Sequence, residues 1–104
     1  MDRENGQLIL REIIDIYCQT APELLQRIKL AIANQDWGNL SSAAHTLGSS
    51  SANLGAVLLA QQAKTLENLT RQRDSRAMDP GHFPTLAASY ERVQGELKTM
   101  LDRL

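Results

Sequence analysis

Cysteine, proline and aromatic residues are all scarce in this sequence of 104 residues. The single cysteine, Cys18, excludes an intramolecular disulfide and leaves no set of cysteines for zinc or an iron–sulfur cluster, so a reducing, cytoplasmic setting is expected. The chain has 3 prolines, 1 tryptophan, 2 tyrosines and 1 phenylalanine. This composition favours helices.

Long apolar runs and an excess of one charge are also missing. No apolar run approaches the roughly 20 residues that span a bilayer, and the N-terminal residues lack a signal-peptide core. The net charge of −1, from 11 basic and 12 acidic residues, argues against nucleic-acid binding and against a polybasic membrane anchor. We therefore expect a single domain over residues 1–104 that binds neither nucleic acid nor membrane.

Apolar residues recur at helical spacing in five stretches, which predict helices over residues 7–18, 21–34, 37–54, 56–71 and 83–104. Thr20 to Glu23 has the form of a capping box, which would separate the first two helices, and Asp36 is a suitable N-cap for the third. A turn is expected at Gly55. Short connections favour antiparallel neighbours, so the predicted fold is all-α: an up-down-up-down four-helix bundle with a short additional N-terminal helix. Because four helices complete a bundle, a monomer is expected.

One histidine lies in a helical segment of unusually small residues. His45 is on the flank of the apolar stripe of its helix. Its neighbours one turn away are Ser41, Ser42, Gly48 and Ser49. The four residues after Leu47 together cost the helix roughly 2 to 3 kcal/mol relative to alanine. Either a neighbouring helix packs closely against them, or the backbone of another protein comes within reach of the imidazole.

The sequence offers little support for a self-contained active site. Neither histidine has a glutamate three residues before it, as the metal sites of helical bundles do, and no strand is predicted to precede a phosphate-binding loop. His82 is interpreted as a loop or capping residue. An exposed imidazole can nevertheless take up a phosphoryl group and release it, while Mg²⁺ and cationic groups are supplied by a partner. We therefore predict a phosphoryl carrier and not an enzyme.

The residues around His45 resemble the histidine-containing phosphotransfer (HPt) domain of multistep two-component phosphorelays. The shared patterns are A-H-x-L with His45, the small residues that follow, A-N-L-G-A from Ala52, and L-x-x-x-A-x-x-L-E ending at Glu67. The resemblance covers roughly residues 8–71. It implies that His45 accepts a phosphoryl group from the aspartyl phosphate of a receiver domain and passes it to another receiver. It also implies that Ser49 lets the receiver loops approach.

Glu67 matches the position where the family often has a Gln or Glu near the imidazole. A hairpin that turns near Gly55 would by itself set His45 level with residues 64–68. A carboxylate there could hold one ring N–H and leave the other nitrogen free to attack. A solvated helix charge is an equally weighted interpretation of Glu67.

The resemblance implies response-regulator receiver domains as partners, and a hybrid sensor histidine kinase as a further one. The chain would then be either a freestanding protein or the cytoplasmic terminal domain of a membrane-bound sensor kinase. No metal or other cofactor is expected in this chain, whereas Mg²⁺ is expected on the partner receiver. The predicted partner surface around His45 consists of Ser41, Ser42, Gly48, Ser49 and Ala52, with Ile14 and Tyr17 of the first helix at its edge.

Gly48 departs from the family pattern, which usually has a lysine three residues after the histidine to neutralise phosphoryl charge. Lys64 or Arg71 on the facing helix could supply this charge, although a solvated side chain is the simpler interpretation of both. The missing lysine leaves open an alternative function, a non-phosphorylated receiver-binding interaction module of the same fold. A bundle that holds a ligand or metal in its core is a third, weaker alternative.

Overall fold

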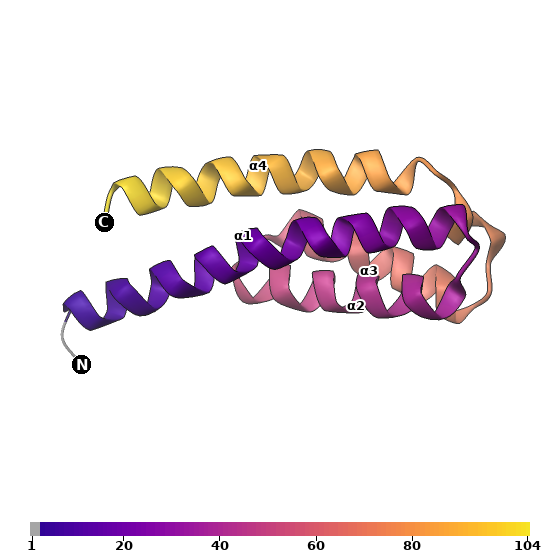
Figure 1. The fold of residues 1–104 in the computed structure, drawn as a ribbon, viewed down its shortest axis with the longest axis horizontal. Helices are drawn as coiled ribbons and strands as arrows, with labels where there is room; N and C mark the ends of the chain where they lie inside the picture. The colour runs from indigo at the N-terminus through magenta and orange to yellow at the C-terminus, as the bar shows by residue number, and fades with distance from the viewer. Residues whose placement is uncertain (1–2) are drawn as a thin grey trace.

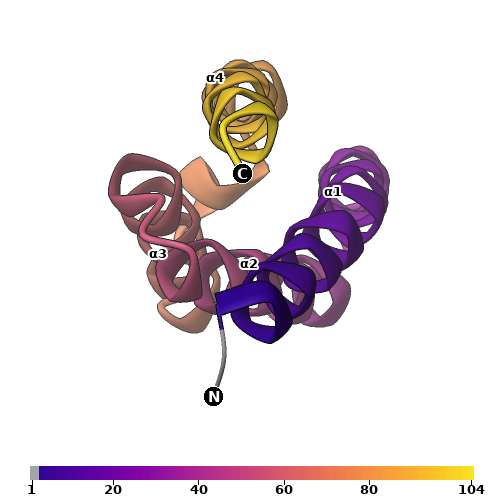
Figure 2. The same ribbon diagram turned by 90° about the vertical axis from the view of Figure 1, so that its left-hand side faces the viewer.

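Residues 3–104 are described by a computed structural model with four α-helices. The elements are α1 (Arg3–Ala33), α2 (Trp37–Asn53), α3 (Val57–Arg71), a short 3₁₀ helix η1 (Ser75–Met78), and α4 (His82–Asp102). No β-strand occurs in this range, so the predicted all-α class is confirmed. Figure 1 shows consecutive helices running in opposite directions. In the end-on view of Figure 2, the four helices surround a common centre in chain order.

The core lies between the four helices. Its largest fully buried aliphatic side chains are Ile14, Ile28, Leu40, Leu47, Leu59 and Leu66. The α2–α3 hairpin has the most extensive packing, and α1 and α4 complete the bundle against it. None of the helices within residues 3–104 is both long enough and apolar enough to cross a membrane.

The ends of α2 follow from local sequence as predicted. Asp36 caps the helix, because its Oδ1 accepts a hydrogen bond of 3.1 Å from the backbone N–H of Asn39. Gly55 adopts a φ of +76°, a left-handed conformation that glycine reaches without a steric penalty. A tight connection therefore joins α2 to α3 and fixes which residues of the two helices face each other.

The predicted short first helix over residues 7–18 is wrong, because α1 continues through Pro22. Proline has no N–H to donate to the carbonyl four residues earlier, which here belongs to Cys18. The hydroxyl group of Tyr90 on α4 donates to this carbonyl instead, at 3.4 Å. A residue from the other end of the chain thus satisfies the group that the proline leaves unpaired. Figure 1 shows α1 as one ribbon that changes direction part-way along.

The predicted capping box at Thr20 is also wrong. The Thr20 hydroxyl donates to the carbonyl of Ile16 at 3.0 Å, which is a bond within the helix and not a cap. The buried face of α1 continues across the proline with Tyr17, Ala21 and Leu25. Burial of this face in the core explains why a local stop signal does not end the helix.

Replacing Tyr90 with phenylalanine should lower the free energy of unfolding by about 0.5 to 1.5 kcal/mol, because the Cys18 carbonyl loses its partner. Burial raises the pKa of Tyr90, so its hydroxyl remains a donor at neutral pH. In a Pro22→Ala background the new N–H can pair with the same carbonyl, and the loss should shrink to less than half. Urea denaturation of the wild type, the two single variants and the double variant measures the loss of unfolding free energy in each background. Equal losses in the two backgrounds would show that the bond does not compensate for Pro22.

Candidate functional site

His45 is on the solvent-facing side of α2. The residues of α2 that are turned into the core are Leu40, Ala43, Ala44, Leu47 and Ser51. Helical geometry places His45 on the other side of the helix, and its side chain is 60% exposed. The ring is therefore accessible to another molecule.

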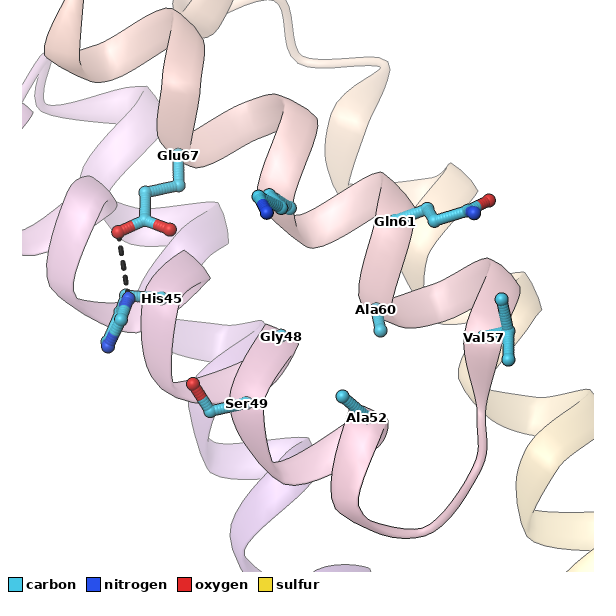
Figure 3. Close-up of a pocket in the computed structure, with 9 residues that line it drawn as sticks. His45, Gly48, Ser49, Ala52, Val57, Ala60, Gln61 and Glu67 are labelled. Atoms are coloured by element: carbon cyan, nitrogen blue, oxygen red, sulfur yellow. Dashed lines mark hydrogen bonds and ion pairs between the residues drawn. The ribbon is translucent and has the colours of Figure 1, made fainter.

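Glu67 of α3 holds one nitrogen of this ring. Its Oε2 atom is 2.9 Å from Nδ1 of His45, as the dashed line in Figure 3 marks. Because an ionised carboxylate can only accept, Nδ1 is assigned the proton, and Nε2 retains a free lone pair. Figure 3 shows the second ring nitrogen turned away from Glu67. The arrangement gives an exposed and oriented imidazole.

Glu67 is itself buried, with only 7% of the residue exposed, so its interpretation as a solvated helix charge is wrong. Arg71, one turn further along α3, donates from Nη2 to the same Oε2 atom at 2.9 Å. The guanidinium supplies the opposite charge that a poorly hydrated carboxylate needs. The pair has the i, i+4 spacing at which side chains on one helix are neighbours.

A groove runs from His45 between α2 and α3 toward the turn that joins them (Figure 3). The groove is open to solvent and has a volume of about 370 Å³. Its walls are formed from α2 by Gly48, Ser49 and Ala52, from α3 by Val57, Ala60, Gln61 and Lys64, and at one end by His45 and Glu67. Small residues keep this groove open beside the imidazole.

Close packing explains part of the run of small residues. A Cβ atom on Gly48 would be 3.5 Å from Cβ of Ala63 and 3.6 Å from the carbonyl oxygen of Ala60, so this position faces α3 at ordinary contact distance. Ser51 is fully buried. Ser49 is exposed on the groove. The two interpretations of the small residues therefore apply to different positions of the same run.

The family model of the Hpt domain matches residues 12–104, which is nearly the whole chain including the site. The chain belongs to the Hpt domain family. No curated protein and no solved structure gives a match. Hpt domains are phosphocarrier modules for histidine phosphotransfer in phosphorelays and interact with receiver domains and kinases.

In this Hpt domain, five of the predicted site residues line the groove: His45, Gly48, Ser49, Ala52 and Glu67. Ser41 and Ser42 lie one turn before His45 on α2, where Ser41 is partly exposed and Ser42 is exposed. Among residues 3–104, no group of His, Cys, Asp and Glu side chains is arranged to hold a metal ion. The second histidine, His82, begins α4 and bonds through Nε2 to the carbonyl of Arg76 at 2.8 Å, away from the groove.

The prediction that Ile14 and Tyr17 border the partner surface is wrong. Both are buried, with 1% and 3% exposure. The hydroxyl groups of Tyr17 and Ser51 share a hydrogen bond of 2.8 Å in the core, and the Tyr17 ring packs against that of Tyr90 with 5.8 Å between the centroids. Because α1 is continuous, these side chains have the same inward orientation as the residues after Pro22.

The exposed apolar face of α1 is formed by Ile9, Ile13 and Ile16. Their spacing of four and three residues places them on one side of the helix. The sequence showed that this segment is apolar on two sides, but it did not show which side is buried. In the structure the side that carries Ile14 and Tyr17 is buried, and Tyr17 bonds to Ser51 there.

Proposed function

We propose that His45 accepts a phosphoryl group from the aspartyl phosphate of a receiver domain and passes it to a second receiver. The main support is the hydrogen bond between Nδ1 and Glu67, which leaves Nε2 as an exposed nucleophile. Imidazole can form such a covalent intermediate and give the group up again.

In the transfer step, the Nε2 lone pair attacks phosphorus. A P–N bond forms, the P–O bond to the aspartate breaks, and the aspartate leaves as a carboxylate. The ring retains its proton on Nδ1 and becomes positively charged, so the Glu67 carboxylate stabilises the product. The reverse sequence on a second receiver regenerates neutral His45. In this scheme, Mg²⁺ and the groups that neutralise the leaving carboxylate belong to the receiver.

The docking surface proposed for the receiver combines two features. The groove beside His45 lets loops approach the ring, and the face formed by Ile9, Ile13 and Ile16 offers apolar area. Ser51, which pairs with Tyr17, is six residues along α2 from His45, an axial distance of roughly 9 Å. A standard interface buries about 800 Å² on each partner, and we propose that this area includes both features.

Replacing Ile13 with aspartate should weaken receiver binding about tenfold, because a charge would have to lose its water at the centre of an apolar contact. The concentration of receiver that half-saturates transfer should rise, while the rate at saturation changes little. Leu30→Asp is the matched control, since Leu30 is on the same helix with a similar exposure of 59%. If the two substitutions have the same effect, the isoleucine face is not part of the docking surface.

The proposed function is tested by incubating the purified chain with a panel of receivers that hold labelled aspartyl phosphate. We expect label to appear on the chain. The label should be lost in acid and persist in base, because a phosphoramidate bond is labile in acid and stable in base. If receivers of the panel bind the chain and none of them transfers label to it, the phosphorelay function is contradicted and the non-phosphorylated interaction module is supported.

A further inference from the structure

Position 48 has no side chain at a point where a phosphoryl group on His45 would need positive charge. Gly48 is one turn after His45 on α2, and both line the same groove. A phosphoryl group on Nε2 adds about two negative charges to the ring that Glu67 holds. The positive charge of the phosphorylated ring offsets only one of them, so a further cation beside the phosphoryl oxygens would stabilise the phosphorylated state.

Lys64 of α3 is across the groove from this vacant position. A Cβ atom on Gly48 would be 3.9 Å from the backbone nitrogen of Lys64, so the two residues stand at the same level of the hairpin. Lys64 also lines the groove together with His45 and Glu67. A lysine side chain that starts here is flexible enough to turn toward a group on the ring.

Arg71, the cation that contacts Glu67, does not line the groove. Arg71 is bonded to Glu67 at 2.9 Å, on the Nδ1 side of the ring. Lys64 is the only Lys or Arg among the groove-lining residues. Of the ion pairs found within residues 3–104, none involves Lys64, and its residue is exposed. Its ammonium group is therefore available to a phosphoryl group.

We propose that Lys64 supplies, from α3, the phosphoryl-binding charge that Gly48 cannot supply from α2. The inference rests on the proposed phosphorylation of His45. The ammonium would donate charge-assisted hydrogen bonds to phosphoryl oxygens as the P–N bond forms, and it would hold them in the phosphorylated state. The missing lysine would then be a change of position and not a loss of function.

The test compares Lys64→Gln with Lys64→Arg and with the double variant Lys64→Gln/Gly48→Lys. Each is phosphorylated by a receiver that is active on the wild type and, separately, by phosphoramidate, a small donor that needs no docking surface. The matched control is Lys98→Gln, because Lys98 is exposed on α4 and does not line the groove. The side chain at position 48 has room, since its Cβ contacts are no shorter than 3.5 Å.

We expect Lys64→Gln to slow phosphorylation about tenfold with both donors and to shorten the lifetime of the phosphorylated protein. Lys64→Arg should retain most of the rate, the double variant should recover it, and the control should match the wild type. Unchanged rates in Lys64→Gln, or slowing with the receiver alone, would overturn the inference. The comparison with phosphoramidate tests the role of Lys64 without a receiver. Failure of every receiver to phosphorylate the wild-type chain would contradict the proposed function and not the role of Lys64.

Discussion

A His45→Gln variant should fold like the wild type and accept no phosphoryl label from any receiver. The His45 side chain is 60% exposed and its bond is to Glu67, which keeps Arg71 as a partner, so the free energy of unfolding should fall by less than about 1 kcal/mol. Glutamine has no ring nitrogen with a nucleophilic lone pair. Label on the protein after incubation with the active receiver measures the loss, and urea denaturation checks the fold.

The matched control is His82→Gln, which removes the other histidine of the chain. His82 is half-buried at the start of α4, bonds to the carbonyl of Arg76 and does not line the groove, so this variant should be labelled like the wild type. If label persists in His45→Gln and disappears in His82→Gln, the phosphoryl acceptor is His82 and the proposed role of His45 is contradicted.

Replacing Glu67 with alanine should slow phosphotransfer by about 10- to 100-fold, the cost typical of losing the second group that orients a functional histidine. Without the carboxylate, the ring can rotate, its tautomers can exchange, and the positive charge on the phosphorylated ring loses its counterion. The effect should appear in the transfer rate at saturating receiver and not in receiver binding, because Glu67 is buried beneath the ring.

A Glu67→Gln variant separates orientation from charge. The amide oxygen can still accept from Nδ1, so the ring keeps its tautomer, whereas the counterion is lost. We expect a rate between those of the wild type and Glu67→Ala, measured by quenched-flow transfer from the same receiver. If Glu67→Ala transfers at the wild-type rate, the contact does not support catalysis.

The site could be predicted from sequence because it depends on two consecutive helices and one short turn. Once Gly55 fixes the turn, the numbers of residues on either side bring Glu67 level with His45, and the structure shows the two side chains in contact. The i, i+4 spacing makes Arg71 a neighbour of Glu67, but only the side-chain rotamers show that His45 and Arg71 contact the same carboxylate oxygen.

The first helix could not be predicted in the same way, because its continuity depends on burial of its inner face against the rest of the bundle. Pro22 is a local stop signal, and Tyr90, which pairs with the freed Cys18 carbonyl, is 72 residues from Cys18. Which apolar side of this segment is buried likewise depends on packing against distant parts of the chain, such as Ser51 of α2, which bonds to Tyr17. These contacts exist only in the folded bundle, so local rules placed Ile14 and Tyr17 on the surface.

Identifying the atom that carries the phosphoryl group is the most direct test of the role of His45. The measurement is NMR of the ¹⁵N-labelled chain after transfer from a phosphorylated receiver, with ³¹P–¹⁵N coupling to identify the bonded nitrogen. We predict coupling to Nε2 of His45, with the proton retained on Nδ1 beside Glu67. Phosphorus bonded to Nδ1, to His82 or to any other residue would contradict the proposed function of this site.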